Sequence, residues 1–335
     1  GLFDLDKNQW DEFLDSLTFG PINYSNQELD YQELYRKGKR FKDIDFSLIT
    51  FFKNNPVSIF SFTISEQDNK KSITSFGLPI LSPLFIDKLD KKIRETITKI
   101  YYDILQEVAL YCQIESWVST SSFTTEKNLS FWHEFSLKKG DKAFLMDDGY
   151  INLKISLDEI DKLYRKRKLL SEIKKASNLW TISIKKKLDY SEWNNFKQLH
   201  ISVSGKQTRS DKTWDSQYND INNQKAFAIF LYDKSRLIGG TMYRYTKTNA
   251  VYAIGAYDRN LFPKPISHLA HYQAIGELKK KKVNWLRMGD IPRHNDYGEP
   301  SKKEISIGFF KKNFATDIFK KSYLIHKRKE KNERI

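Results

Sequence analysis

The hydrophobic positions of this chain follow one order of patterns twice. In the first half, strand-like runs at 47–53, 57–64 and 72–80 precede a long stretch in which apolar residues recur every three or four positions. That spacing puts them on one face of a helix. The residues of this stripe are Ile86, Leu89, Ile93, Ile97, Ile100, Ile104 and Val108. A further strand-like run at 113–120 follows.

The second half repeats this order. Apolar runs at 226–232, 237–246 and 250–257 are separated by short polar turns, which predicts an antiparallel meander. A helix from about Pro265 to Lys282 and a strand at 283–289 follow. Two successive units of meander, helix and strand predict an α/β (α+β) protein with two tandem domains and mixed, mainly antiparallel sheets.

A basic helix is predicted between the halves, at residues 156–178. Ser156 and Glu159 have the spacing of a capping box, in which each side chain bonds to an otherwise free N–H of the first turn. We therefore predict a first domain over residues 1–155. Residues 156–335 would then hold the basic helix, the second domain and a basic C-terminal tail.

The net charge narrows the choice of partners. The chain has 335 residues, with 57 Lys and Arg against 42 Asp and Glu, and a formal net charge of +15. Such a charge attracts nucleic acid, phosphorylated substrates and anionic lipid surfaces; a lysine-rich proteome is the alternative explanation. Arg165, Lys166 and Lys168 are the candidates for polyanion binding, and a solvated helix face is their alternative role. A second basic run, Lys320–Arg334, is expected to be partly disordered.

Cysteine content and hydropathy indicate the compartment. Cys112 is the only cysteine, so no intramolecular disulfide forms and a reducing environment suits the chain. No apolar run approaches the ~18 residues that a membrane span needs. We expect a cytoplasmic protein without a transmembrane segment, whose basic surface makes peripheral contact with an anionic membrane.

The segment 199–215 combines cations with an aromatic residue. The tripeptide that ends at Lys206 resembles the end of a phosphate-binding P-loop, but His200 stands where that motif needs its first glycine. We therefore predict a substrate-binding loop, in which Lys206 and Arg209 bind an anionic group and Trp214 stacks on a sugar or a base. The alternative is a surface loop anchored by a buried tryptophan.

Other catalytic and metal-binding motifs are missing. Neither G-x-S-x-G nor a G-x-G-x-x-G after a strand occurs, so the sequence indicates neither a hydrolase triad of that type nor a dinucleotide fold. His268 and His271 share one face of the second-half helix. No third ligand lies at a recognisable zinc spacing, so we predict no metal site. Both histidines are candidates for substrate contact or for hydrogen bonds between the domains.

The order of meander, helix and strand is similar to the GNAT acyltransferase core. In that fold the strand before the central helix splays from its neighbour, and the acyl donor enters the gap. Members that use acetyl-CoA carry a glycine-containing loop just before the helix, which directs backbone amides at the pyrophosphate. The corresponding segment 258–264 has no glycine, and 77–88 in the first half has one glycine and two prolines. These loops count against acetyl-CoA bound in the usual way.

From Ile151 to about Phe319 the sequence resembles the FemABX family, which has a duplicated GNAT fold and transfers amino acids from aminoacyl-tRNA to peptidoglycan precursors. The matching segments, in the family's order, are 151–176, 237–258, 268–290 and 307–316. The last segment resembles the family's closing F-K-x-x-F signature, with Phe310, Lys311 and Phe314 in the matching places. We predict a helix there, on which Ile307, Phe310 and Phe314 pack into the second domain. The resemblance implies two tandem GNAT-like acyltransferase domains.

The resemblance also implies roles for individual residues. Lys311 would supply a cation at the donor's phosphate or at the leaving oxygen, with Phe310 in contact with substrate. Tyr252, Tyr257 and Asp258 lie on or just after the strand that borders the donor gap, and each is a candidate for proton transfer. The candidates for acceptor binding are Arg287, Asp290 and Glu304.

The expected function is transfer of an aminoacyl group from aminoacyl-tRNA to an amine of a cell-envelope precursor, without a cofactor. The alternative is an acyl-CoA-dependent N-acyltransferase that acts on an amino sugar for surface glycan synthesis. A third class is a non-catalytic protein that binds RNA or a membrane. In the first two classes the partners are tRNA or another phosphorylated donor, and an envelope or glycan precursor as acceptor.

Replacing Arg165, Lys166 and Lys168 together with glutamine is expected to weaken polyanion binding and to flatten its salt dependence. Each phosphate contact adds roughly 0.7–0.9 to the slope of log K against log salt concentration. The measurement is the affinity for a fluorescent nucleic acid at several salt concentrations. An unchanged slope would show that these three charges only face solvent.

Overall fold

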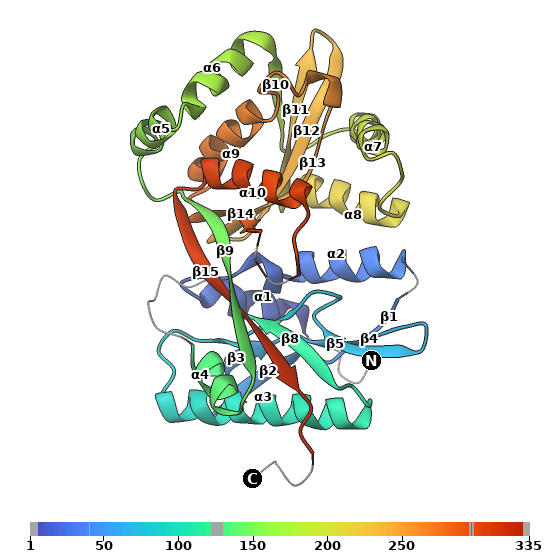
Figure 1. Ribbon diagram of the computed structural model, residues 1–335, viewed down its shortest axis with the longest axis vertical. Coiled ribbons are helices and arrows are strands. Elements are labelled where there is room, and N and C mark those ends of the chain that lie inside the picture. The colour runs from blue at the N-terminus through green and yellow to red at the C-terminus, as the bar shows by residue number, and fades with distance from the viewer. Residues whose placement is uncertain (1–5, 40, 122–129, 295, 297, 331–335) are drawn as a thin grey trace. The chain divides into compact units, whose positions relative to one another are not determined.

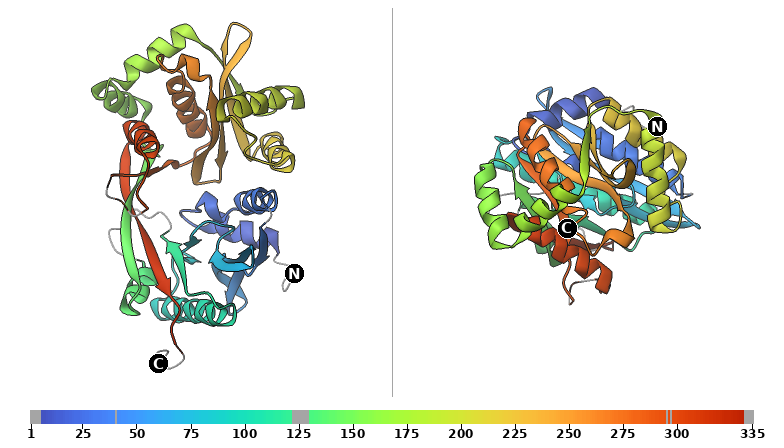
Figure 2. Two further views of the ribbon diagram at one scale, coloured as in Figure 1. Left: turned by 45° about the vertical axis from the view of Figure 1, so that its right-hand side comes forward. Right: turned by 90° about the horizontal axis from the view of Figure 1, so that it is seen from above.

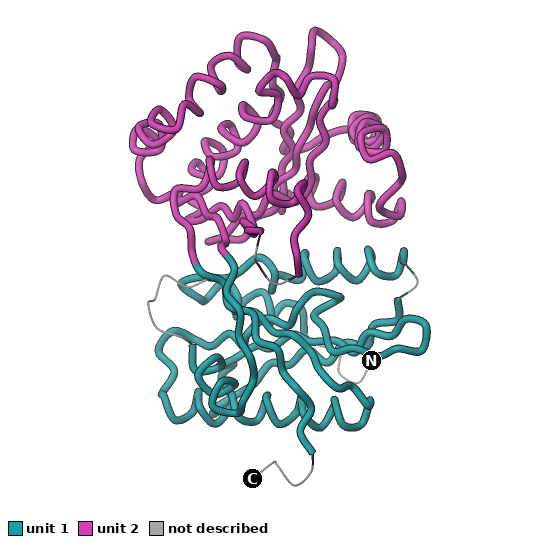
Figure 3. The backbone as a smooth tube through the Cα atoms, viewed as in Figure 1, with its two compact units in different colours: residues 1–146, 320–335 teal, residues 147–319 magenta. Residues whose placement is uncertain are grey.

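A computed structural model describes residues 6–39, 41–121, 130–294, 296 and 298–330. The chain forms two compact units (Figure 3). Unit 1 contains residues 1–146 and 320–335, and unit 2 contains residues 147–319. The predicted first domain, 1–155, also contains residues 147–155, which belong to unit 2. The predicted second domain, 156–335, also contains residues 320–335, which belong to unit 1.

Strand pairing explains both differences. β9 (Lys142–Asn152) passes from unit 1 into unit 2, because its second half pairs with β14 (Trp285–Ile291). β15 (Asp317–Lys327) passes back into unit 1, where it pairs antiparallel with β8 (Ser116–Thr120). Much of the basic run that was predicted to be partly disordered is therefore a strand. Residues 331–334 of that run lie outside the described residues.

Unit 1 combines small sheets with one long helix. Its other elements are α1 (Lys7–Ser16), η1 (Ile22–Tyr24), α2 (Asn26–Lys37), β1 (Lys42–Asp45), β2 (Leu48–Phe52), β3 (Asn55–Phe60), β4 (Thr63–Gln67), β5 (Lys70–Thr74), β6 (Ile80–Leu81), β7 (Leu84–Phe85), α3 (Lys91–Tyr111) and α4 (Phe131–Lys138). The strands β1, β4 and β5 form one antiparallel sheet, β2, β3 and β7 form another, and β6 pairs with β8. The predicted run at 57–64 is thus divided between two sheets.

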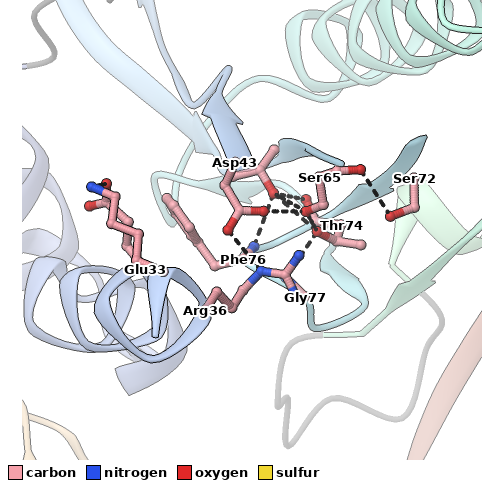
Figure 4. A network of polar contacts seen from close by, with 10 residues as sticks. Glu33, Arg36, Asp43, Ser65, Ser72, Thr74, Phe76 and Gly77 are labelled. Carbon is pink, nitrogen blue, oxygen red and sulfur yellow. Dashed lines mark hydrogen bonds and ion pairs between the residues drawn. The ribbon is translucent and has the colours of Figure 1, made fainter. Parts of the chain in front are cut away.

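A buried ion pair joins α2 to the sheet of β1, β4 and β5 (Figure 4). Arg36 Nε donates to Asp43 at 2.8 Å, and both side chains are buried. Asp43 also accepts from the hydroxyl of Ser65, which in turn bonds to Thr74. Gly77 has φ +81°, and a Cβ there would lie 2.0 Å from Nη1 of Arg36. Because both side chains are buried and bonded to each other, the pair serves the packing of unit 1.

Unit 2 is a mixed sheet with helices on both faces (Figures 1 and 2). Besides β9 and β14, its elements are α5 (Leu157–Lys166), α6 (Leu169–Leu179), β10 (Thr181–Lys185), α7 (Tyr190–Ser204), α8 (Asp211–Asn222), β11 (Ala226–Asp233), β12 (Arg236–Tyr245), β13 (Asn249–Tyr257), η2 (Arg259–Leu261), α9 (His268–Lys280) and α10 (Lys302–Phe314). The strand order is β10-β11-β12-β13-β14-β9, and only β13 and β14 are parallel neighbours. The meander, helix and strand predicted for the second half are confirmed.

Alternate residues of β11 enter two different cores. Phe227, Ile229 and Leu231 belong to the core that contains residues of α5, α6 and α9. Phe230 belongs to the core that contains residues of α7 and α8. Because successive side chains of a strand point to opposite faces, a continuous apolar run such as 226–232 is typical of a strand that is covered on both sides. Figure 1 shows these helices on the two sides of the meander.

β13 and β14 stay paired for three residues only. The paired residues are Asn249, Ala250 and Val251 with Trp285, Leu286 and Arg287. Both strands, all of whose residues are described, continue beyond that point without further pairing to each other, to Tyr257 and Ile291. The strand before the central helix α9 therefore splays from its neighbour, as the GNAT-like order predicts.

The predicted basic helix at 156–178 is broken in two. α5 ends at Lys166 and α6 begins at Leu169. Between them Lys168 has φ +59°, a left-handed conformation that cannot continue a right-handed helix. The predicted capping box at the start of α5 is present. Arg165, Lys166 and Lys168 are all exposed, so polyanion binding by them stays a prediction.

The turn between α5 and α6 holds the C-terminus of α10. Arg167 Nη1 donates to three backbone carbonyl oxygens at the end of α10. They belong to Lys312 (3.3 Å), Asn313 (2.9 Å) and Ala315 (2.6 Å). Tyr164 Oη donates to the carbonyl oxygen of Phe314 at 2.9 Å. The last carbonyl groups of a helix have no partner within the helix, so these bonds both satisfy them and fix the position of α10.

Replacing Arg167 with alanine is expected to destabilise the protein, because the carbonyl groups at the end of α10 lose a charged donor. The expected loss is about 1–2 kcal/mol of unfolding free energy, or roughly 2–8 °C in Tm. Arg165→Ala is the matched control on the exposed end of α5, with an expected change below about 0.5 kcal/mol. Thermal unfolding of both variants measures the difference. Equal Tm values would contradict this role of Arg167.

Candidate active site

A cavity of about 420 Å³ lies in unit 2 where β13 and β14 diverge. The two strands, the segment that leads into α9, and α10 all contribute to its wall. The site residues predicted from the sequence that line it are Tyr252, Tyr257, His268, His271, Phe310 and Lys311. The splay thus brings together residues that are up to 59 positions apart in the chain (311 − 252).

Aromatic rings pack on one another along the inner wall. His271 lies between Tyr252 and Phe310, with ring centroids 4.9 and 5.4 Å from its own. Nδ1 of His271 is 2.6 Å from the hydroxyl of Tyr243. His268, on the preceding turn of α9, packs edge-on against Phe310 at 5.4 Å. These contacts fix the ring orientations, so the wall has a defined shape before any ligand enters.

Burial sets the protonation of the polar groups in this wall. Burial lowers the pKa of His271 to about 3, and the charge of His268 is a second cause of this shift. Burial also lowers the pKa of His268. Both imidazoles are therefore mainly neutral at pH 7. Burial raises the pKa of Tyr257. The Tyr257 hydroxyl and Nδ1 of His268 have no hydrogen-bond partner among the described residues, which is uncommon for buried polar atoms.

Lys311 reaches from α10 to the strand β14. Its Nζ donates to the backbone carbonyl of Asp290 at 3.3 Å. Burial lowers the pKa of Lys311 and the charge of Arg287 lowers it further, whereas the carboxylates of Asp290 and Asp148 raise it. Gly289, with φ +100°, gives this ammonium its room, because a Cβ at that position would lie 3.1 Å from Nζ.

Arg287 is held by two carboxylates beside the cavity. Its Nε donates to Asp148 at 2.7 Å and its Nη2 to Asp290 at 2.9 Å. Burial alone would lower the pKa of Arg287, but the neighbouring carboxylates raise it well above its ordinary value. Neither Arg287 nor Asp290 lines the cavity. Both lie on the same strand as Met288, which does line it, so acceptor binding by Arg287 and Asp290 stays a prediction.

Asp258 and Glu304 are engaged in local structure. Asp258 accepts from the amide of Asn260 and forms an ion pair with Arg236 at 3.1 Å. Glu304 accepts from the amide and the hydroxyl of Ser301, and so completes a capping box at the start of α10. Neither residue lines the cavity. The structure therefore does not bring the predicted proton shuttle Asp258 or the predicted acceptor ligand Glu304 into the site.

The segment 199–215 is not a binding loop. Its first part is the end of α7 and its last part is the start of α8, with a short turn between them. Trp214 is only 1% exposed and packs in the core beside α7, so the prediction that it stacks on a ligand is wrong. The alternative, a buried tryptophan that anchors the surface, is correct.

The two predicted cations of this segment differ in position. Arg209 lies over the ring of Trp214 at 5.8 Å. Burial raises the pKa of Tyr252 to about 12, and the charge of Arg209 acts in the opposite direction. The guanidinium of Arg209 is therefore within electrostatic range of the cavity wall. Lys206 is exposed on the turn and does not line the cavity. Ligand binding by Arg209 and Lys206 stays a prediction.

Sequence reasoning missed a second group of lining residues. They are Phe262, Lys264, Ile266, Ser267, Met288, Ser306 and Ile307. Ile307 was predicted to pack into the second domain, but it is 44% exposed at the cavity, whereas Phe314 is fully buried. Apart from Lys264, the missed residues are small or apolar, and the group follows no recognisable spacing. Their one signal in the sequence is closeness to the segments that match the FemABX pattern.

A Ser–His–Asp series occurs in unit 1, without the accessibility that a hydrolase needs. His326 lies 2.6 Å from the hydroxyl of Ser119 and 2.7 Å from a carboxylate oxygen of Asp141. Ser119 is fully buried and also accepts from the indole N–H of Trp132 at 3.1 Å. Tyr102 donates to the same carboxylate oxygen as His326. This network joins β8 and β15 to α3, α4 and the residue before β9, and its buried serine is not accessible to a substrate.

The described residues contain no group of three His, Cys, Asp or Glu side chains that is arranged to hold a metal ion. His268 and His271, the pair weighed as metal ligands, have aromatic neighbours. No helix of the described part of the chain is long and apolar enough to cross a membrane.

Comparison with known proteins places the fold. No family model matches the sequence, and no curated protein matches it at a significant level. Among solved structures, the chain is similar to FemX, with a TM-score of 0.69 and 10% identity over 96% of each chain. It is also similar to a tandem GNAT protein from the clavulanic acid biosynthesis pathway (TM-score 0.52, 9% identity, 98% and 96% covered). The chain is also similar to L-PGS from Bacillus licheniformis, with a TM-score of 0.50 and 11% identity over 85% of each chain.

The fold is that of the tandem GNAT group of structures, in which two GNAT-like domains follow one another in the chain. Within that group the chain has a FemABX-like fold, which confirms the predicted fold class and the resemblance noted in its sequence.

Replacing Gly289 with alanine is expected to destabilise the protein and to displace Lys311. The left-handed φ of +100° strains any residue with a Cβ, at a cost of about 1–3 kcal/mol, and the added Cβ meets the ammonium. Gly276→Ala is the matched control, because this glycine of α9 has no positive φ and an added Cβ would meet nothing within 4 Å. Its expected effect is neutral or stabilising by about 0.5–1 kcal/mol. The measurement is thermal unfolding of both variants, and equal shifts in Tm would contradict this role of Gly289.

Proposed function

We propose that this protein is an acyltransferase that moves an aminoacyl group from aminoacyl-tRNA to an amine of a peptidoglycan or surface-glycan precursor. The observation that carries the proposal is Lys311, a partly buried lysine in the wall of the cavity between the splayed strands of a FemABX-like fold. In this proposal the cavity holds the acyl end of the donor. The exposed residues Arg165, Lys166 and Lys168 contact the phosphates of the tRNA.

The proposed reaction is aminolysis of an ester. The neutral acceptor amine attacks the carbonyl carbon, an amide bond forms, and the ester bond to the tRNA ribose breaks. The amine loses a proton, and the leaving hydroxyl gains one. Lys311 supplies the positive charge that stabilises the developing oxyanion. Tyr257, whose hydroxyl has no partner among the described residues, is our candidate for proton transfer. The aromatic wall limits the entry of water and thus hydrolysis of the ester.

The segment before α9 favours aminoacyl-tRNA over acyl-CoA as donor. A pyrophosphate would need several free backbone amides there. The amides that already donate to oxygen atoms of the same segment are those of Asn260, Leu261, Phe262, Lys264, Ile266 and His268. Pro263 and Pro265 have no amide hydrogen to offer. This bonding adds to the absence of glycine in 258–264 as an argument against the acyl-CoA alternative.

Replacing Lys311 with alanine is expected to lower kcat/KM for aminoacyl transfer at least 10-fold, which corresponds to about 1.4 kcal/mol of transition-state stabilisation. The loss of stability is expected to be small, because a partly buried charge is removed along with its desolvation cost. The measurement is the transfer of labelled aminoacyl groups from charged tRNA to an amine-bearing envelope precursor.

Lys312→Ala is the matched control for this variant. Lys312 is the next residue of α10 but is exposed and does not line the cavity. Its replacement is expected to leave both kcat/KM and Tm nearly unchanged. If the two variants had equal activity, Lys311 would no longer belong to the site, and the main support for the proposed function would be gone.

A further inference from the structure

The cavity of unit 2 has a mostly apolar wall. Its apolar and aromatic lining residues include Tyr252, Tyr257, Phe262, Ile266, Met288 and Phe310. Two histidines complete the aromatic part of the wall, His268 and His271, and both are mainly neutral at pH 7 because burial lowers the pKa of each. A wall of this kind favours a ligand group that has an apolar surface of its own.

The charged residues of the lining are basic. Lys264 and Lys311 line the cavity, and the described lining residues include neither Asp nor Glu. The ammonium of Lys264 lies 5.3 Å from the centroid of the Trp180 ring. The ammonium of Lys311 donates to the backbone carbonyl of Asp290 at 3.3 Å. A further ammonium group that entered this cavity would therefore lose its water without gaining an anionic partner, which is costly.

Three carboxylates whose charge acts on lining residues already have cationic partners. Asp148 and Asp290 pair with Arg287 at 2.7 and 2.9 Å. Glu172 of α6 pairs with Lys175 at 2.7 Å. None of the three carboxylates lines the cavity. They therefore offer a cationic ligand group no direct partner in the wall.

We propose that the cavity selects an aminoacyl group whose side chain is apolar and of the size of leucine or phenylalanine. This inference rests on the proposed function and names the class of aminoacyl group that the donor carries. An apolar cavity of about 150 Å³ holds a benzene molecule. The cavity of about 420 Å³ therefore has room for such a side chain together with the ester.

The polar atoms of the wall suit the parts that all aminoacyl groups share. The hydroxyl of Tyr257 and Nδ1 of His268 have no hydrogen-bond partner among the described residues, and both residues line the cavity. An ester and an α-amine supply partners for two such atoms. The side chain of the aminoacyl group is then left to the apolar part of the wall.

The experiment uses one tRNA body that carries leucine, phenylalanine, glycine, glutamate or lysine in turn, each joined by a stable amide, so that only the aminoacyl group differs. The measurement is the equilibrium affinity of the full wild-type chain for each form and for the uncharged tRNA. The leucyl and phenylalanyl forms are expected to bind at least about 10-fold tighter than the lysyl form, whose ammonium would be left unpaired. A preference of at least about 10-fold is also expected over the glycyl form, which has no side chain to bury.

Two kinds of failure give different results in this experiment. If every charged form bound tighter than uncharged tRNA, but the glycyl, glutamyl or lysyl form bound as tightly as the leucyl form, this inference would be overturned and the proposed function would stand. If all charged forms bound only as tightly as uncharged tRNA, both would be overturned.

A carboxylate introduced into the lining is expected to reduce the selectivity. Phe262 lines the cavity and is 59% exposed, so Phe262→Glu is expected to fold. This variant is expected to lower the ratio of leucyl to lysyl affinity at least about 3-fold, because an apolar contact is lost and the lysyl ammonium gains an ion-pair partner.

Phe309→Glu is the matched control for this variant. Phe309 is 65% exposed and does not line the cavity, and its replacement changes the net charge by the same amount. The ratio of leucyl to lysyl affinity is expected to stay within about 1.5-fold of wild type, since exposed substitutions away from the site have small effects. Equal ratios in the two variants would contradict the inference.

Discussion

The short pairing of β13 and β14 is the constraint on which the rest of unit 2 depends. Parallel neighbours in a sheet normally stay hydrogen-bonded along their length, because an unpaired buried backbone group is costly. Here β14 pairs with β9 from Trp285 to Ile291 but with β13 only from Trp285 to Arg287, so the sheet opens between β13 and β14. The cavity exists because the strands diverge, and α9 and α10 supply the side chains that shape it.

Holding a lysine in this gap requires that α10 be fixed firmly. Removing an ammonium from water costs several kcal/mol, which only nearby negative charge and hydrogen-bond acceptors offset. Asp290 and Asp148 supply that charge, and Gly289 makes room for the ammonium. The same C-terminal end of α10 is tied by Arg167, which donates to three backbone carbonyl oxygens there.

The sequence was informative where one local pattern decides the outcome. Apolar runs between polar turns predicted the meander, three- and four-residue spacing predicted α3, and the F-K-x-x-F segment predicted Lys311 and Phe310 at one site. The sequence did not predict the role of a side chain that can bond to, or pack against, several different partners. Asp258, Glu304 and Trp214 all have residue types suited to binding, but local caps and core packing occupy them. Lys168 has no glycine-like signal, so the break between α5 and α6 was not predictable.

The central claim is that the cavity of unit 2 receives the acyl end of a charged tRNA. Its most direct test is the equilibrium affinity of the wild-type protein for the same bulk tRNA in its charged and uncharged forms, with acetyl-CoA as a third ligand. The account predicts tighter binding of the charged form by at least several-fold, and no detectable binding of acetyl-CoA. Equal affinity for charged and uncharged tRNA, or saturable binding of acetyl-CoA, would contradict it.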